Sequence, residues 1–88
     1  MIRREVEIRN PLGLHARAAA RFVHTAATFR ASVTVTRGER TMDGKSILGI
    51  LLLAASRGTR LVLAAQGADE RECVKALAEL VESGFGEG

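Results

Sequence analysis

Two residues suited to phosphate chemistry stand close together in residues 10–17, NPLGLHAR. His15 carries an imidazole, which is nucleophilic in its neutral form and can take a phosphoryl group covalently and release it again. Arg17 carries a planar guanidinium whose fork of N–H donors matches phosphate oxygens. The spacing therefore predicts a site that holds or transfers a phosphoryl group.

The residues after His15 predict a helix that begins at this site. Apolar residues recur at three- and four-residue spacing over residues 16–28: Ala19, Phe22, Val23, Ala26 and Ala27. The first N–H groups of a helix have no intrahelical partner, and its dipole is positive at that end, so an anion is stabilised there. We expect the backbone of Ala16 and Arg17 to bind the phosphate. His24 lies 180° around the helix from His15 and should face solvent.

The remaining pattern predicts the element order β-α-β-β-α-β-α in one domain, residues 1–88. Strands are expected at residues 2–9, 32–36, 40–42 and 60–66, and further helices at 47–54 and from a capping-box pair, Asp69 and Glu72, to Gly84. Alternating strands with one polar face predict an antiparallel sheet covered by helices on one side, an α+β fold. The pattern alone also allows a ferredoxin-like split βαβ arrangement.

The helix at residues 47–54 is apolar nearly all round, and Ser46 before it is a suitable N-cap. If Ile50 and Leu53 face the sheet, other apolar side chains of this helix are left outside. These are Ile47, Leu48 and Leu51. Such an exposed patch on a small protein usually marks a protein interface.

Composition limits the function further. The net charge of +3 comes from scattered arginines, and the chain has no Trp or Tyr to stack on bases, so nucleic acid is not an expected partner. The single Cys73 has no disulfide partner and no metal-ligand cluster around it, which favours a reducing compartment and no bound metal. No apolar run is long enough to span a bilayer. We expect a cytoplasmic monomer without a cofactor.

Two nucleotide- or RNA-binding motifs fail on spacing. Residues 38–46 resemble a P-loop, but five residues separate Gly38 from Gly44 where the motif requires four. Gly44 and Gly49 likewise do not form the GXXG loop of a KH domain. An acylphosphatase-like enzyme would need a phosphate loop with arginine and asparagine, and none can be placed.

Residues 13–17 (GLHAR), followed about thirty residues later by residues 44–50 (GKSILGI), resemble the two signatures of the HPr family. These are histidine phosphocarriers of the bacterial phosphoenolpyruvate-dependent phosphotransferase system. The resemblance covers nearly the whole chain and includes the closing residues 83–85, SGF. It implies an open-faced β-sandwich, in which a four-stranded antiparallel sheet carries three helices on one face.

The resemblance also implies roles for individual residues. His15 would accept the phosphoryl group on its δ nitrogen from Enzyme I and pass it to IIA components of sugar permeases, with Arg17 stabilising the phosphate. Ser46 would be a possible target of an HPr kinase/phosphorylase. The docking face would combine Ala16 and Ala20 with the apolar patch on the short helix, and the protein would be a relay rather than an enzyme.

One departure lies beside the site, because the family usually has proline where this chain has Ala18. Proline in a first helical turn fixes φ and has no N–H to leave unpaired, so alanine should loosen the helix start slightly. Two alternatives stay open. One is a carrier of the nitrogen-related branch, where the SGF ending also occurs, and the other is a small basic nucleic-acid-binding module.

Overall fold

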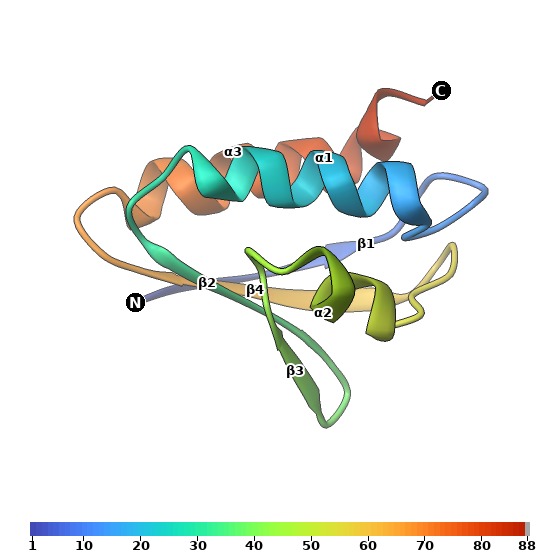
Figure 1. Ribbon diagram of the computed structural model, residues 1–88, viewed down its shortest axis with the longest axis horizontal. Helices are drawn as coiled ribbons and strands as arrows, with labels where there is room; N and C mark the ends of the chain where they lie inside the picture. Colours follow the sequence, from blue (N-terminus) through green and yellow to red (C-terminus); the bar gives the residue numbers. More distant parts are fainter. Residues whose placement is uncertain (88) are drawn as a thin grey trace.

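A computed structural model describes residues 1–87 and confirms the predicted order of elements (Figure 1). The strands are β1 (Ile2–Glu7), β2 (Ser32–Arg37), β3 (Arg40–Asp43) and β4 (Arg60–Gln66). The helices are α1 (Ala16–Ala27), α2 (Ile47–Leu52) and α3 (Glu70–Glu82), followed by a short 3₁₀ turn, η1 (Gly84–Gly86). Strand β1 and helix α2 end two residues earlier than the pattern predicted, a shift typical of fraying ends.

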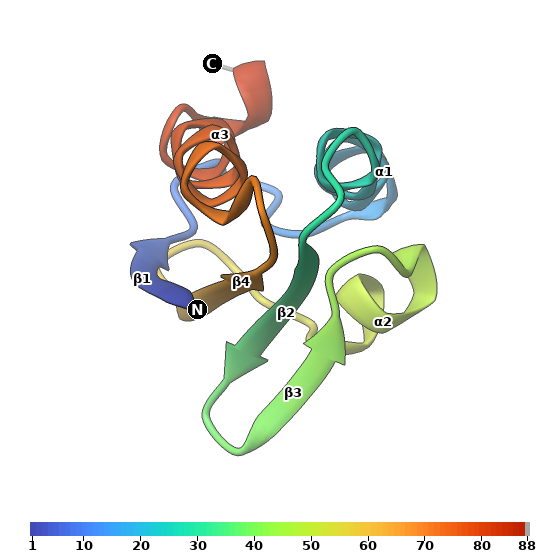
Figure 2. The same cartoon turned by 90° about the vertical axis from the view of Figure 1, so that its left-hand side faces the viewer.

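The four strands form one sheet in the order β1-β4-β2-β3, and every pairing is antiparallel. Strands β1 and β2 run parallel on either side of β4, so the pairing alone also fits a split βαβ unit. The strand order excludes the ferredoxin-like alternative, because β1 lies at the edge of this sheet, whereas the first strand of a ferredoxin-like sheet lies between two others. Seen end on, the three helices lie on the same side of the sheet (Figure 2). The predicted open-faced sandwich is therefore confirmed.

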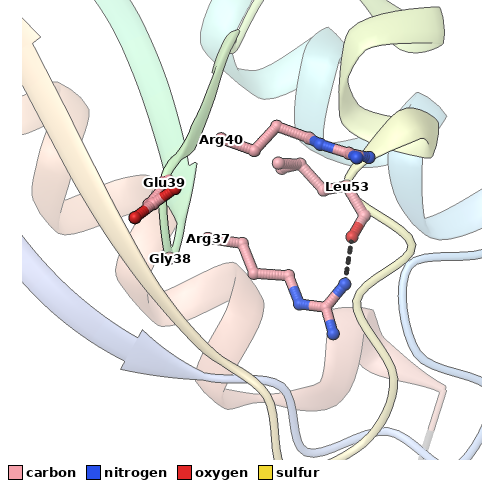
Figure 3. A pocket seen from close by; sticks show the side chains of 5 residues that line it. All are labelled: Arg37, Gly38, Glu39, Arg40 and Leu53. Carbon is pink, nitrogen blue, oxygen red and sulfur yellow. Dashed lines mark hydrogen bonds between the residues drawn. The ribbon is translucent and has the colours of Figure 1, made fainter.

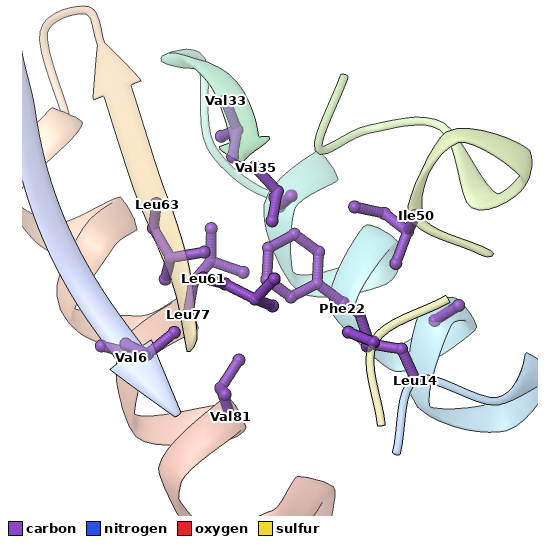
Figure 4. Close-up of a cluster of buried hydrophobic side chains, with 14 of the residues drawn as sticks. Val6, Leu14, Phe22, Val33, Val35, Ile50, Leu61, Leu63, Leu77 and Val81 are labelled. Carbon is purple, nitrogen blue, oxygen red and sulfur yellow. The ribbon is translucent and has the colours of Figure 1, made fainter. Parts of the chain in front are cut away.

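The hydrophobic core fills the space between the helices and the covered face of the sheet. Phe22 of α1 lies near its centre, 1% exposed, with Leu61 and Leu63 of β4 and with Ile50 of α2 around it (Figure 4). Leu77 of α3 is also fully buried. Burying these side chains contributes most of the favourable free energy of folding, and it fixes α1 against the sheet. The N-terminus of α1 is thereby held in place.

The start of α3 differs from the predicted capping box. Asp69 precedes the helix but makes no capping bond; its carboxylate accepts hydrogen bonds from the backbone N–H groups of Arg30 and Ala31, both at 2.8 Å. Glu70, rather than Glu72, accepts from a backbone N–H before the helix. The loop after α1 brings unpaired donors to Asp69, and ionised acceptors for such donors are strongly favoured.

We predict that the contact between Asp69 and the loop after α1 makes the protein less stable as the pH falls into the acid range. The hydrogen bonds from Arg30 and Ala31 hold the pKa of Asp69 below its ordinary value of 3.8. A group with a lowered folded-state pKa adds stability above its unfolded pKa, and this contribution is lost as pH falls through the folded-state value. We expect Asp69→Asn to lower the unfolding free energy at pH 7 and to flatten its decline below about pH 4.

Urea unfolding between pH 2 and 7 measures this effect. Glu79→Gln removes an exposed carboxylate of α3 and serves as the matched control, which should follow the wild-type pH dependence. Equal pH dependences for Asp69→Asn and the wild type would contradict the prediction.

Candidate functional site

His15 is the N-cap of α1, and the helix begins at Ala16, directly after it, as the sequence predicted. Its backbone is extended, with φ −76° and ψ 177°, and its ring nitrogen Nδ1 accepts a hydrogen bond from the backbone N–H of Arg17 at 3.3 Å. The side chain is 26% exposed. The ring is therefore held at the helix start and remains open to solvent on one side.

The loop before His15 is tied to the loop between α2 and β4. The N–H of Leu14 donates to the carbonyl of Ala55 at 2.9 Å, and the Leu14 side chain is buried in the core. Gly13 adopts a φ of +67° in close contact with the same carbonyl. Gly13 thus occupies a backbone conformation that favours glycine, and Leu14 anchors the loop in the core. These contacts fix the position from which the imidazole projects.

The phosphate-binding groups predicted at the helix start are accessible. Within residues 1–87, the N–H of Ala16 has no hydrogen-bond acceptor, as expected for a first-turn donor. The Arg17 side chain is exposed, and it joins none of the ion pairs formed by the part of the chain that the structure describes. An oxyanion beside Nδ1 would thus lie close to the unpaired Ala16 N–H and to the residue that carries an exposed guanidinium, Arg17. Ala18 is fully buried, and the helix still begins at Ala16.

Two residues that the sequence did not indicate also lie at this site. The other ring nitrogen of His15, Nε2, lies 2.6 Å from Oε2 of Glu87, 72 residues away in the chain. The second carboxylate oxygen of Glu87 accepts from Nδ2 of Asn10 at 3.0 Å. Figure 1 shows the C-terminal segment next to the start of α1. His15 and Glu87 come together only because α3 docks against the sheet. Their spacing in the sequence therefore gave no signal of this contact.

Ser46 caps α2, because its Oγ accepts from the N–H of Gly49 at 3.0 Å. The predicted cap is confirmed. Ser46 as a whole is partly buried. On α1, His24 is exposed, as predicted from its position on the helix.

The apolar surface of α2 agrees with the prediction except at one position. Ile47 and Leu48 are 46% and 68% exposed, while Ile50 and Leu53 are buried. Leu51 was predicted to be exposed, but it packs partly against the core, and Leu52 at 50% exposure takes its place. Helix α1, with exposed Ala16 and half-buried Ala20, packs beside α2 (Figure 2).

A separate hollow of about 620 Å³ lies between the β2–β3 turn and the end of α2, lined by Arg37, Gly38, Glu39, Arg40 and Leu53 (Figure 3). Arg37 donates to the carbonyl of Leu53 at 2.9 Å, and Arg40 donates to that of Leu52 at 2.7 Å. The last carbonyls of a helix lack intrahelical partners and carry partial negative charge. These arginines therefore stabilise the end of α2, which accounts for their position without a ligand.

Among residues 1–87, no helix combines the length and the apolar composition needed to cross a membrane.

Comparison with known proteins agrees with this fold and site. Residues 2–83 match the family described as "PTS HPr component phosphorylation site". The chain is 47% identical over 88 residues to the phosphocarrier protein HPr of Neisseria meningitidis serogroup A, covering 100% of this chain and 99% of that protein. It is 48% identical over 85 residues to phosphocarrier protein HPr of Pseudomonas aeruginosa, covering 96% of this chain and 94% of that protein.

The crystal structure of HPr-C-His from Thermoanaerobacter tengcongensis is similar over 100% of this chain and 99% of that chain, with a TM-score of 0.96 and 45% sequence identity. The fold, an open-faced α+β sandwich with a partly exposed histidine at the start of its first helix, is the fold of the histidine phosphocarrier class to which these relatives belong. The chain belongs to the HPr family of the phosphotransferase system. The resemblance read from residues 13–17 and 44–50 is confirmed.

Proposed function

We propose that the protein accepts a phosphoryl group on Nδ1 of His15 from phosphoenolpyruvate-charged Enzyme I and passes it to IIA-type acceptors in sugar uptake and its regulation. The observation that carries this proposal is the arrangement at the start of α1. There, Nδ1 of a partly exposed ring faces the Arg17 N–H, and the Ala16 N–H is unpaired within the described residues. The protein would act as a relay and not as an enzyme with free turnover.

The transfer step needs only groups that the site supplies. The lone pair of Nδ1 forms a bond to phosphorus, and the bond from phosphorus to the donor atom breaks, its electron pair staying with the donor. The Arg17 N–H, which donates to Nδ1 at 3.3 Å before the reaction, can then donate to a phosphoryl oxygen. The Ala16 N–H and the Arg17 guanidinium add two more donors, so positioning and electrostatic stabilisation account for the chemistry.

The proposal is tested by incubating the full chain with phosphoenolpyruvate and Enzyme I. One acid-labile, base-stable phosphate per chain is expected, and NMR of the phosphorylated protein should place it on Nδ1 of His15. A chain that stays unlabelled under conditions in which a known HPr is labelled would overturn the proposal. So would a phosphate on any other residue.

Partners would dock on the surface formed by α1 and α2 together. The proposed contacts are Ala16 and Ala20 on α1 with Ile47 and Leu48 on α2, and the partly buried Leu51 contributes less than its sequence position indicated. This surface lies next to the reactive ring, as a relay between proteins requires. We place this function in the cytoplasm and assign it to a monomer, although a solved HPr from T. tengcongensis is described as a dimer.

We propose that phosphorylation of Ser46 regulates binding at this docking surface. A phosphate there would put close to two negative charges beside Ile47 and Leu48. We expect Ser46→Asp to slow phosphoryl transfer from Enzyme I several-fold while the unfolding free energy changes by less than about 1 kcal/mol, because aspartate is also a good N-cap.

Initial rates of labelling at varied Enzyme I concentration measure this effect, and Ser46→Asn, which keeps a cap without charge, is the control. Equal rates for Ser46→Asp and the wild type would exclude regulation by charge at this position.

A further inference from the structure

The contact between Glu87 and His15 has no part in the function proposed so far. Oε2 of Glu87 lies 2.6 Å from Nε2 of His15, on the side of the ring away from the Arg17 N–H. The two side chains are 14% and 26% exposed, so the contact is largely shielded from water. Ring and carboxylate come from segments 72 residues apart, and the fold holds them together.

The hydrogen bonds around the ring determine which nitrogen carries its proton. A backbone N–H can only donate, so Nδ1 must present its lone pair to Arg17. An ionised carboxylate can only accept, so Nε2 must carry the hydrogen and donate it to Glu87. The reactive nitrogen is thus the unprotonated one before any partner binds.

Glu87 is itself held in place by its neighbours. Its Oε1 accepts from Nδ2 of Asn10 at 3.0 Å, and the same amide group donates to the carbonyl of Gly13 at 2.8 Å. Both partners of Nδ2 are acceptors, so the orientation of the Asn10 amide is fixed by the network. Asn10 is 1% exposed. A buried side chain therefore links the carboxylate to the loop that carries His15.

The turn before Glu87 is anchored as well. Phe85 is buried, at 1% exposure, and its carbonyl accepts a hydrogen bond from the Arg21 side chain of α1. The N–H of Glu87 donates to the carbonyl of Gly84 at 3.1 Å. Although burial opposes ionisation, the hydrogen bonds from His15 and Asn10, and the charge of Arg21, lower the pKa of the Glu87 carboxyl. The group is ionised where the carrier would work.

We propose that Glu87 is a positioning residue, which holds the proton of His15 on Nε2 and stabilises the cationic ring that forms when Nδ1 takes a phosphoryl group. This inference rests on the proposed function. When Nδ1 bonds to phosphorus, the Nε2 proton stays on the ring and positive charge spreads over both nitrogens. That charge faces the Glu87 carboxylate. A carboxylate has the same effect on the histidine of a serine-protease triad and on histidine ligands of metals.

The test compares the ¹⁵N-labelled full chain in four forms: wild type, Glu87→Ala, Glu87→Gln and Glu82→Ala. Glu82 of α3 pairs with Arg4 of β1, so replacing Glu82 changes the net charge by the same amount as replacing Glu87 does, without touching the ring. In the wild type, the ring nitrogens should show distinct shifts, with Nε2 protonated and Nδ1 not. In Glu87→Ala the two shifts should move toward each other, because both tautomers become populated. Glu87→Gln should retain much of the difference, since its amide oxygen still accepts from Nε2.

Phosphoryl transfer provides the second measurement. The rate constant should fall about tenfold or more in Glu87→Ala, recover partly in Glu87→Gln and stay at the wild-type value in Glu82→Ala. Unchanged ring shifts in Glu87→Ala would overturn the proposal even if transfer slowed, because the residue would then affect docking. Changed shifts with an unchanged rate would overturn the stabilisation of the cationic ring.

The two proposals fail in different ways. The ring shifts are measured without any phosphoryl donor, so a wild type that takes no phosphate overturns the proposed function and leaves the tautomer test intact. A wild type that is labelled normally, alongside a Glu87→Ala variant with wild-type shifts and rate, overturns only the role of Glu87.

Discussion

His15→Asn is expected to abolish labelling by phosphoenolpyruvate and Enzyme I while leaving the fold intact. Asparagine has no nucleophilic ring nitrogen, so no phosphoryl group can be carried. It is also a favoured N-cap whose side-chain oxygen can accept from the Arg17 N–H, as Nδ1 of His15 does at 3.3 Å. The unfolding free energy should therefore change by less than about 1 kcal/mol. Radiolabel incorporation and urea unfolding measure the two effects.

His24→Asn is the matched control, because His24 lies exposed on the same helix, on the opposite side. This variant should be labelled like the wild type. Labelling that survives in His15→Asn would place the carrier residue elsewhere. Labelling that is lost equally in both variants would indicate damage to the helix and not removal of a nucleophile.

Gly13→Ala should produce the largest loss of stability, about 2–5 kcal/mol. Gly13 has a φ of +67°, which costs an alanine about 1–2 kcal/mol. A Cβ there would lie 2.5 Å from the carbonyl oxygen of Ala55 and 2.9 Å from Cα of Ser56, both backbone atoms that cannot turn aside. The loop would have to move, and the N–H of His15, which donates to the Gly13 carbonyl at 2.9 Å, would move with it. Labelling should slow as well.

Gly38→Ala separates the two causes of this loss. Gly38 has a similar φ of +60°, but nothing lies within 4 Å of a Cβ placed there. Its replacement should cost only the conformational part, about 1–2 kcal/mol. If urea unfolding gave equal losses for Gly13→Ala and Gly38→Ala, the close approach to Ala55 would not be a source of the effect.

Much of the fold follows from local patterns. The spacing of Ala19, Phe22 and Ala26 predicted α1 and its buried face, and alternating residues predicted β4 with its bounds as observed. These signals are reliable because of how each element packs on a core. A strand buries every second residue, and a helix buries one stripe of its surface. The cap at Ser46 was also predictable, since such a cap acts within one turn.

Local patterns failed where a distant segment supplied the partner. Asp69 was predicted to cap α3 and instead accepts from Arg30 and Ala31, 39 and 38 residues away. Leu51 was predicted to be exposed and instead packs partly against the core, while its neighbour Leu52 is 50% exposed. Propensity is a weak guide at such positions, since tertiary contacts outweigh differences of a few tenths of a kcal/mol.

The sequence by itself determined the order of elements and the place of a histidine and an arginine at a helix start, since both depend on neighbours within a few residues. Only the tertiary structure brought Glu87 to Nε2 of His15 and set buried Asn10 behind it. The reason is that the proton of an imidazole is assigned by whichever donors and acceptors surround it in space. For His15, one partner is the Arg17 N–H in the first turn of α1, and the other is Glu87, which reaches the ring only when α3 docks against the sheet.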